Sequence, residues 1–545
     1  MAAPKSMAEL QREANPASAT DATVRGTERT TAQPTLYPAE PSAFLDPVTG
    51  RVVAVVNWAG LPIPVHTAHR HFVIAGVPGT GKTVAVRKLL HSVLSPTARP
   101  HLSGTDRAVI YDAKRELYPF LLGIGVPETR IDILNPFDAR SSAWCIAKDY
   151  RSPAAALQLA KFLIPCPESH SQPFFPKSAA ALLATTLTAF MKTQPDVWDL
   201  LLVITACTKR ERMKAVWQEA DPHKRNPYIE LARSVFAGSA DTTGNVVAEL
   251  TSHLFEYLPV AEAWRAAAVE GKTFSVTDFV GQPDRIALLG ASQTHSTAVQ
   301  AVNRLLVKRL AEVILDTPGG QWRSGNRTWL VLDEVRELGQ VDGLPDLINK
   351  GRDRGVCGVI GFQDYVELED AFGKGVAHAI TATAAYRLFL RLGGESAEWA
   401  SRAFSKAEVS EAQVTVSSGT NFQVNSSLSA TVNQSVTAPW GLAGSNFGTF
   451  TSSYAVTAAA GVAIGANSQL TSSEQKKEKD VVLSSEIAGL PDFDTGGGLT
   501  GFSTLFTAEG KAVVYRLHVA AKDLTEGMKD SDDAGYEERT IPDAG

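Results

Sequence analysis

The sequence predicts an α/β protein with a mainly parallel central sheet, interrupted by an inserted all-α domain. Short apolar runs at residues 72–75, 107–111 and 131–134 are separated by helical segments, and the pattern resumes with runs at 286–289 and 329–332. Continuous apolar runs that alternate with helices are typical of parallel strands buried on both faces. Two groups of strands on either side of a strandless stretch therefore predict one sheet with an insertion.

The strandless stretch, from about residue 149 to 275, has helical spacing instead. Leu183, Leu187 and Phe190 recur at intervals of four and three residues. Apolar residues at such intervals line one face of a helix. Prolines separate the helical segments, so the stretch is interpreted as a bundle of several helices.

Composition limits the classes of function. The 545 residues carry 52 Lys and Arg against 58 Asp and Glu, a net charge of −6, so any contact with nucleic acid would have to come from a local basic surface such as a channel lining. The four cysteines form no C-x-x-C pair and are interpreted as reduced core thiols of a reducing compartment. With neither a signal peptide nor a membrane span predicted, we expect a cytoplasmic protein, with recruitment to the inner membrane by partners as a further possibility.

A nucleotide-binding motif follows the apolar run at 72–75. Its residues are Gly76, Val77, Pro78, Gly79, Thr80, Gly81, Lys82 and Thr83, which match the P-loop pattern G-x-x-x-x-G-K-[ST]. Glycines let the backbone N–H groups approach a phosphate closely, and a helix that begins at Lys82 adds its positive dipole. Lys82 is expected to neutralise the β- and γ-phosphates and the Thr83 hydroxyl to bind Mg²⁺, which predicts ATP and Mg²⁺ as ligands.

Two carboxylates end the apolar run at 329–332. We expect Asp333 to hold Mg²⁺ through its water shell and Glu334 to polarise the attacking water. An acidic strand end alone would be explained by solvation; the P-loop elsewhere in the chain favours the functional interpretation. Gln363 is the first polar residue after the apolar run 356–362 and could donate to the γ-phosphate, although a surface glutamine explains the same letters.

Further motifs follow in a specific order. They are VIYDAKRE at 109–116, LNPFD at 134–138, LDE at 332–334 with LG at 338–339, KGR at 350–352 before GFQ at 361–363, and VLSSEI at 482–487 with LP at 490–491. Together with the P-loop they resemble the coupling ATPases of type IV secretion and conjugative DNA transfer, which are relatives of the septal DNA translocases. The resemblance spans roughly residues 71–410 and 480–520.

This resemblance implies a RecA-like motor domain that assembles as a hexamer around DNA, with secretion or relaxosome components as partners. Arg352 would then be an arginine finger that reaches the neighbouring subunit's nucleotide, although a solvated charged face with Lys350 and Arg354 explains the same residues. A basic cluster in the insertion would face the substrate or, equally well, solvent: Lys209, Arg210, Arg212 and Lys214. The chain departs from the family in its polar first 45 residues, where family members usually carry membrane helices.

Residues 412–473 contain no Lys, Arg, Asp or Glu. This composition favours a solvated low-complexity loop, and the alternation of Val424, Ser426 and Leu428 with polar neighbours leaves a β-hairpin or self-associating strands as the alternative.

The whole chain divides into seven predicted segments. They are a flexible arm (1–45), the first part of the nucleotide-binding domain (46–148), the all-α insertion (149–275), the second part of the nucleotide-binding domain (276–411), the uncharged insertion (412–475), the final strands (476–521) and an acidic polar tail (522–545).

The function predicted from these features is a ring-forming ATPase that translocates DNA or a DNA–protein complex. Two alternatives remain open at this point: a soluble DNA-directed ATPase of a mobile-element or defence locus, and a nucleotide-dependent scaffold that self-associates through the uncharged insertion.

Overall fold

The computed structural model describes most of the chain. The described residues are 23–26, 28–30, 53–98, 106–167, 169, 171–320, 326–404, 406–421, 430–436, 450–456, 465–506, 512–531 and 535–539. They fall into two compact units: the first comprises 1–31, 398–484 and 506–514, and the second comprises 32–397, 485–505 and 515–545. The alternation at Val424, Ser426 and Leu428, most of the predicted N-terminal arm and residues 540–545 lie outside the described residues.

A ten-stranded sheet forms the centre of the fold, in the order β2-β19-β18-β13-β5-β12-β11-β6-β10-β7. Its strands are β2 (Glu28–Thr30), β5 (Phe72–Ala75), β6 (Arg107–Asp112), β7 (Ile131–Ile133), β10 (Ile286–Gly290), β11 (Thr328–Leu332), β12 (Val356–Phe362), β13 (Tyr386–Phe389), β18 (Gly498–Phe506) and β19 (Ala512–Ala520). Every neighbouring pair from β13 to β7 is parallel, and β18 runs antiparallel to β13. The predicted mainly parallel α/β sheet is confirmed.

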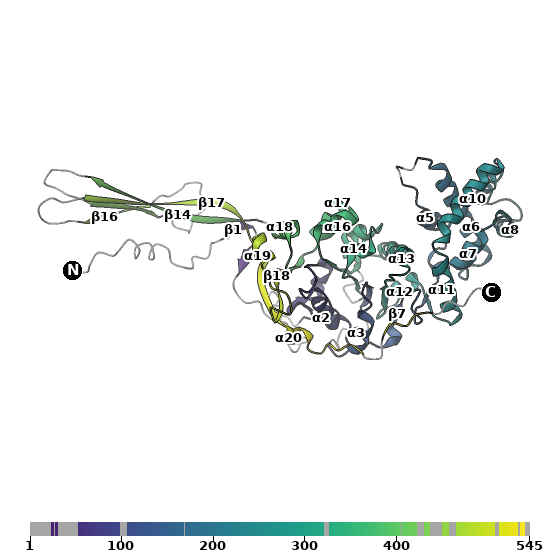
Figure 1. Cartoon of the computed structure of the whole chain (residues 1–545), viewed down its shortest axis with the longest axis horizontal. Helices are drawn as coiled ribbons and strands as arrows, with labels where there is room; N and C mark the ends of the chain where they lie inside the picture. Colours follow the sequence, from purple (N-terminus) through teal and green to yellow (C-terminus); the bar gives the residue numbers. More distant parts are fainter. Residues whose placement is uncertain are drawn as a thin grey trace. The chain divides into compact units, whose positions relative to one another are not determined.

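The parallel strands are apolar because helices cover them. All residues of β5, β6, β10, β11 and β12 are buried. The helices that connect the strands include α2 (Lys82–Leu94), α3 (Leu117–Gly123), α13 (Ser296–Asp316), α14 (Val335–Leu338), α15 (Leu344–Lys350), α16 (Tyr365–Phe372) and α17 (Lys374–Ala382), seen in sequence colours in Figure 1. At the amino end of β5, the Phe72 ring stacks on Tyr386 at 5.0 Å and meets Trp58 at 5.0 Å between centroids. Such aromatic pairs add about 0.5–1.5 kcal/mol to the apolar burial.

Seven helices fill the predicted all-α insertion. They are α5 (Pro153–Leu163), α6 (Phe174–Thr193), α7 (Leu200–Cys207), α8 (Arg210–Ala220), α9 (Pro227–Val235), α10 (Ala240–Phe255) and α11 (Leu258–Val269), several of which are labelled in Figure 1. Ser152, Asp199, Asn226 and Ser239 cap four of them by accepting a backbone N–H of the first turn. Caps of this kind contribute about 1 kcal/mol each and set where the helices begin.

Helix α6 is the one described helix whose length and hydropathy would allow it to cross a membrane. No membrane span was predicted for these residues from the sequence. In its most apolar window 61% of the helix is buried, because it packs against α5, α8, α9 and α10.

The two ends of the insertion are tied together at its base. Strand β8 (Ala143–Trp144) pairs in parallel with β9 (Thr273–Phe274), on opposite sides of the insertion. Buried Asp149 accepts from the Trp144 indole at 2.6 Å, from the Ser275 hydroxyl at 2.9 Å and from two backbone N–H groups that begin helix α12 (Val276–Gly281). A buried carboxylate costs several kcal/mol unless it is fully bonded, so Asp149 needs both ends of the insertion in place.

The uncharged insertion contains strands in its described residues. The favoured prediction of a solvated loop is therefore wrong for these residues. Strand β14 (Lys406–Asn421) pairs antiparallel with β17 (Gly465–Asp480), and β15 (Ala430–Val436) pairs with β16 (Phe450–Val456) and with β17. Backbone hydrogen bonds need no charged side chains, and the Val and Thr residues common here favour extended backbone. Strand β1 (Thr23–Gly26) joins β14, so the predicted flexible arm also contains ordered backbone.

The C-terminal segment folds back onto the second unit instead of leaving it as a polar tail. After helix α20 (Ala521–Thr525), buried Arg539 donates to the backbone oxygen of Ala139 at 2.9 Å and to the Glu270 carboxylate at 3.1 Å. A buried guanidinium satisfied in this way ties residues 535–539 to the base of the insertion. The Tyr536 hydroxyl adds a second contact by donating to the Phe137 carbonyl at 2.9 Å, and the acidic composition of the segment did not predict either contact.

Candidate functional site

The P-loop has the backbone that its glycines predict. Strand β5 ends at Ala75, and helix α2 begins at Lys82. Gly79 and Gly81 have φ angles of +81° and +95°, in the left-handed region that other residues adopt only with strain. The loop therefore depends on glycine at these two positions for its conformation.

Residues from distant parts of the chain hold the loop in place. The Val77 N–H donates to the Arg391 carbonyl at 2.9 Å, and the Phe493 N–H donates to the Gly79 carbonyl at 3.0 Å. A Cβ at Gly81 would lie 2.7 Å from the Phe493 ring. Sequence reasoning missed both Arg391 and Phe493, although the motif at 490–491 directly precedes Phe493.

Lys82 is buried at the start of α2, with 7% of its surface exposed. Its ammonium donates to the Gly76 carbonyl at 2.6 Å. Burial lowers the pKa of Lys82, while the carboxylates of Glu334 and Asp333 raise it. The lysine and the two predicted acidic residues are thus electrostatically coupled.

Asp333 lies beside the P-loop, as predicted. The Thr83 hydroxyl donates to Asp333 Oδ2 at 3.2 Å, across 250 residues of sequence. Strand β12 lies between β5 and β11 in the sheet, and the backbone of Asp333 passes directly over Gly361 of β12. A methyl group at Gly361 would overlap the Asp333 carbonyl, so the missing side chain allows Asp333 to reach Thr83.

Gly361→Ala is expected to lower the free energy of unfolding by about 1–3 kcal/mol, because the added methyl group must displace the Asp333 backbone. The urea midpoint of the full chain measures the change. Gly375→Ala, in α17, is the matched control, since a Cβ there meets nothing within 4 Å. Equal midpoints for the two variants would contradict the tight approach of Asp333 to β12.

The Thr83–Asp333 pair fits a divalent cation. Burial raises the pKa of Asp333, against the lowering effect of Lys82. Its Oδ1 is buried and, among the described residues, has no hydrogen-bond partner. An orphaned buried carboxylate oxygen next to a hydroxyl suits Mg²⁺, which takes one or two protein oxygens and completes its shell with phosphate and water.

Glu334 is 7% exposed and directly precedes helix α14. Burial raises the pKa of Glu337 and the pKa of Tyr111 on the neighbouring strand β6, and the Glu334 charge adds to both shifts. The Tyr111 hydroxyl is buried without a hydrogen-bond partner among the described residues, and the Lys114 charge lowers the pKa of Asp333 and Glu337. Tyr111 and Lys114 belong to the motif at 109–116, whose pattern alone predicted no role for either residue.

Gln363 and Arg352 lie at opposite edges of the sheet. Gln363 directly follows β12, on the edge where β5 and β11 end in the P-loop and in Asp333. Arg352 belongs to the short helix η5 (Gly351–Arg354), which precedes β12. The seven residues of β12 separate the two edges by about 20 Å at roughly 3.3 Å per residue. Arg352 therefore does not reach the nucleotide site of its own chain.

Arg352 lies close to His71, the residue just before β5. The pKa of His71 is lowered to about 4 from an ordinary 6.5, mainly by burial and to a smaller extent by the charges of Arg352 and His69, while a hydrogen bond to the Ile348 carbonyl opposes these effects. Since the folded-state value lies below the unfolded one, the unfolded chain binds the proton more tightly. The stability associated with neutral His71 is therefore complete above pH 6.5 and is lost as the pH falls towards 4.

The expected loss is about 3 kcal/mol at about 1.36 kcal/mol per pKa unit. Urea midpoints of the wild type and of His71→Gln, measured from pH 7.5 to pH 4.5, isolate this titration because glutamine does not titrate. We expect a steeper fall for the wild type. Parallel curves would show that folding does not lower the pKa of His71.

Two of the four residues in the predicted basic cluster contact one aromatic side chain. The Arg210 guanidinium lies 5.0 Å from the Phe236 ring centroid and the Lys214 ammonium 5.8 Å from it. Arg212 donates to the Thr205 carbonyl at 3.3 Å. Lys209, Arg212 and Lys214 remain exposed, so a substrate-facing role for the cluster stays a prediction.

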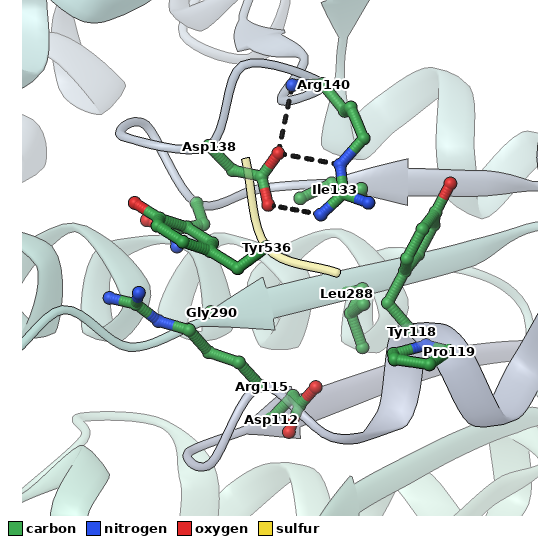
Figure 2. A pocket seen from close by; sticks show the side chains of 11 residues that line it. Asp112, Arg115, Tyr118, Pro119, Ile133, Asp138, Arg140, Leu288, Gly290 and Tyr536 are labelled. Atoms are coloured by element: carbon green, nitrogen blue, oxygen red, sulfur yellow. Dashed lines mark hydrogen bonds and ion pairs between the residues drawn. The ribbon is translucent and has the colours of Figure 1, made fainter. Parts of the chain in front are cut away.

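One pocket lies at the same sheet edge as the P-loop, but over β6, β7 and β10 (Figure 2). Arg140 bonds both oxygens of Asp138 at 2.8 and 2.9 Å, and the Arg115 guanidinium stacks on Tyr536 at 4.0 Å from the ring centroid. Its volume of about 30 Å³ admits a few water molecules and excludes a nucleotide. The P-loop edge therefore remains the candidate nucleotide site, and this pocket is not a candidate.

Comparison with known families decides the affiliation of the chain. Residues 55–499 match the family described as the type IV secretion-system coupling protein DNA-binding domain. This range runs from β3 (Val55–Trp58) into β18 and includes the P-loop, the helical insertion and both carboxylates. The chain belongs to this family of coupling proteins.

TraD and TrwB are distant from this coupling protein in sequence. The coupling protein TraD of Escherichia coli K12 is 23% identical over 343 residues, which are 62% of the chain and 44% of TraD. The matched region thus spans less than half the length of this relative. The unbound conjugative coupling protein TrwB lacking its first 70 residues has the same fold, with a TM-score of 0.62 at 19% identity over 95% of this chain and 97% of that one. TrwB in complex with ADP and Mg²⁺ gives 0.61 at 18% identity, over 95% and 98%.

Proposed function

We propose that this coupling protein hydrolyses ATP and uses the energy to translocate DNA, or a DNA–protein complex, towards a type IV secretion channel. The contact between Thr83 and Asp333 supports the proposal most directly, because it joins the P-loop to the acidic strand end. TrwB is known in complex with ADP and Mg²⁺, and we extend this class of ligand to the present chain.

The P-loop would hold the triphosphate through its backbone N–H groups and Lys82. Thr83 and Asp333 would hold Mg²⁺, which when bound neutralises phosphate charge and orients the terminal phosphoryl group. The ammonium of Lys82 can move from the Gly76 carbonyl to a phosphate oxygen because its side chain is a flexible point charge.

Glu334 would orient and deprotonate the water that attacks the γ-phosphate. Its position directly after Asp333 suits this role, since the water must lie on the far side of the phosphate from the leaving group. Gln363 directly follows β12, which lies between the P-loop strand β5 and the Asp333 strand β11. From this position its amide would donate to the γ-phosphate.

Arg352 would complete the site of a neighbouring subunit. Its place on the edge opposite its own P-loop is the one an arginine finger in a ring requires, and we propose a homo-hexamer on the family pattern. Hydrolysis would then depend on assembly. DNA contact would be largely sequence-independent and therefore sensitive to salt.

ATP turnover of the purified full chain against protein concentration, with and without single- or double-stranded DNA at low salt, tests the proposal. We expect a cooperative rise with concentration and stimulation by DNA, both absent in Lys82→Ala. Turnover indifferent to both kinds of DNA, together with no binding of either, would overturn it.

A further inference from the structure

His71 makes two hydrogen bonds that connect separate parts of the sheet's amino edge. The side chain is 1% exposed, immediately before the P-loop strand β5. The Gly358 N–H of β12 donates to His71 Nδ1 at 3.0 Å, and His71 Nε2 lies 2.7 Å from the Ile348 carbonyl. Because Nδ1 accepts, the proton of the neutral ring is on Nε2, which donates to Ile348.

The Ile348 carbonyl is one that its own helix leaves without a partner. Ile348 lies in the last turn of α15, which ends at Lys350, and carbonyls of the last turn have no intrahelical donor. His71 therefore supplies the donor that this buried helix end needs. Helix α15 runs directly into η5, which carries Arg352.

Close packing leaves this segment little freedom. A Cβ at Gly351 would lie 2.8 Å from Val356 Cγ2, and a Cβ at Gly358 would lie 2.7 Å from Ile348 Cδ1. The segment thus rests against β12 at two glycines while His71 ties it to β5. The imidazole of His71 is thus a direct side-chain link between the residue that precedes the P-loop strand and the helix end that leads to Arg352.

We infer that His71 is a positioning residue that sets the placement of Arg352 through the Ile348 carbonyl. It would link the strand that carries a subunit's own P-loop to the arginine presented to the next subunit. The inference rests on the proposed action of Arg352 in trans.

Two variants separate the two hydrogen bonds. In His71→Gln the amide nitrogen stands near the position of Nε2 and can still donate to Ile348. In His71→Asn the amide oxygen stands near Nδ1 and can still accept from Gly358, but the side chain is too short to reach Ile348. Both variants keep the P-loop and its carboxylates unchanged.

We expect His71→Asn to lower DNA-stimulated turnover about tenfold, the loss of one transition-state contact worth about 1.36 kcal/mol, and to leave the affinity for a non-hydrolysable ATP analogue unchanged. His71→Gln should stay within about threefold of the wild type. Mixing His71→Asn with Glu334→Gln subunits should restore part of the turnover, because each subunit supplies the group that the other lacks. A general folding defect would not be repaired in this way.

Arg352→Ala mixed with Glu334→Gln is the reference. The inference about His71 is wrong if mixing restores the turnover of Arg352→Ala but not that of His71→Asn. It is also wrong if His71→Asn alone is fully active. In either case the proposed ring motor stands. If Arg352→Ala itself is not rescued, action in trans fails and the inference fails with it.

Should His71→Asn not fold, the double variant His71→Gln with Glu334→Gln tests the same point. Subunits with this double variant, mixed with Arg352→Ala subunits, should restore turnover to the same extent as Glu334→Gln subunits do. Failure to do so would show that the Ile348 hydrogen bond does not place the arginine.

Discussion

Glu334→Gln is expected to lower ATP turnover by about a thousandfold, within the range of about 10²–10⁴ for removal of a general base. Glutamine has nearly the same shape but cannot accept the proton of the attacking water. Affinity for ATP should persist or rise, because Lys82, Thr83 and Asp333 are untouched and one buried negative charge near the phosphates is removed. Single-turnover hydrolysis and equilibrium nucleotide binding measure the two quantities separately.

Glu337→Gln is the matched control. Glu337 lies three residues further on in α14, is more exposed than Glu334 and also interacts with the Lys114 charge. It should retain most of the turnover. If Glu334→Gln hydrolyses ATP normally, or if Glu337→Gln is equally inactive, the assignment of Glu334 as the base is wrong.

Lys82→Ala should abolish turnover and also weaken binding, in contrast to Glu334→Gln. A hydrogen bond to a charged group contributes about 1.5–3 kcal/mol, which corresponds to roughly a 10- to 100-fold loss of ATP affinity. The ammonium is buried against the P-loop at the start of α2 and is coupled to Asp333 and Glu334, so its removal also leaves the carboxylates without their nearest cation.

Lys88→Ala provides the control within the same helix. The Lys88 ammonium donates to the Glu526 carbonyl at 3.0 Å, away from the P-loop residues. Its loss should leave nucleotide affinity unchanged, as titration with a fluorescent ATP analogue would show. Similar affinities for the two variants would mean that Lys82 does not contact the phosphates.

Local signals identified the residues at the carboxyl edge of the sheet. The P-loop can be recognised in the sequence because its glycines must adopt left-handed φ angles next to a buried strand. Asp333 and Glu334 can be recognised because these acidic residues directly follow an apolar run. The residues that hold these groups carried no such signal. Phe493 and Arg391 bind the loop through backbone hydrogen bonds, which any residue type can form, and no local pattern predicts that the Phe493 ring lies beside Gly81.

The predictions made from composition were wrong for two segments whose structure depends on long-range backbone contacts. The uncharged segment lacks the charges that loops and surface strands usually carry, yet nine residue pairs of β14 and β17, from Gln413 with Ser473 to Asn421 with Gly465, lie within it. The acidic tail contains one arginine, Arg539, whose burial depends on carbonyls near residue 139. A basic side chain in an acidic segment gave no indication of these partners.

The amino-acid sequence was sufficient to specify the nucleotide-binding loop, the alternation of strands and helices and the chemistry at each strand end, because these depend on backbone conformation and periodicity within a few residues. The folded chain alone decided that Thr83 and Asp333 meet across 250 residues, and that Arg352 lies on the far edge beside His71. Long-range packing sets the order of the strands and the end of the sheet at which each residue lies. Strand β12 lies between β5 and β11, where Gly361 leaves room for the Asp333 backbone, and the residues next to Gly361 in the sequence do not predict this contact.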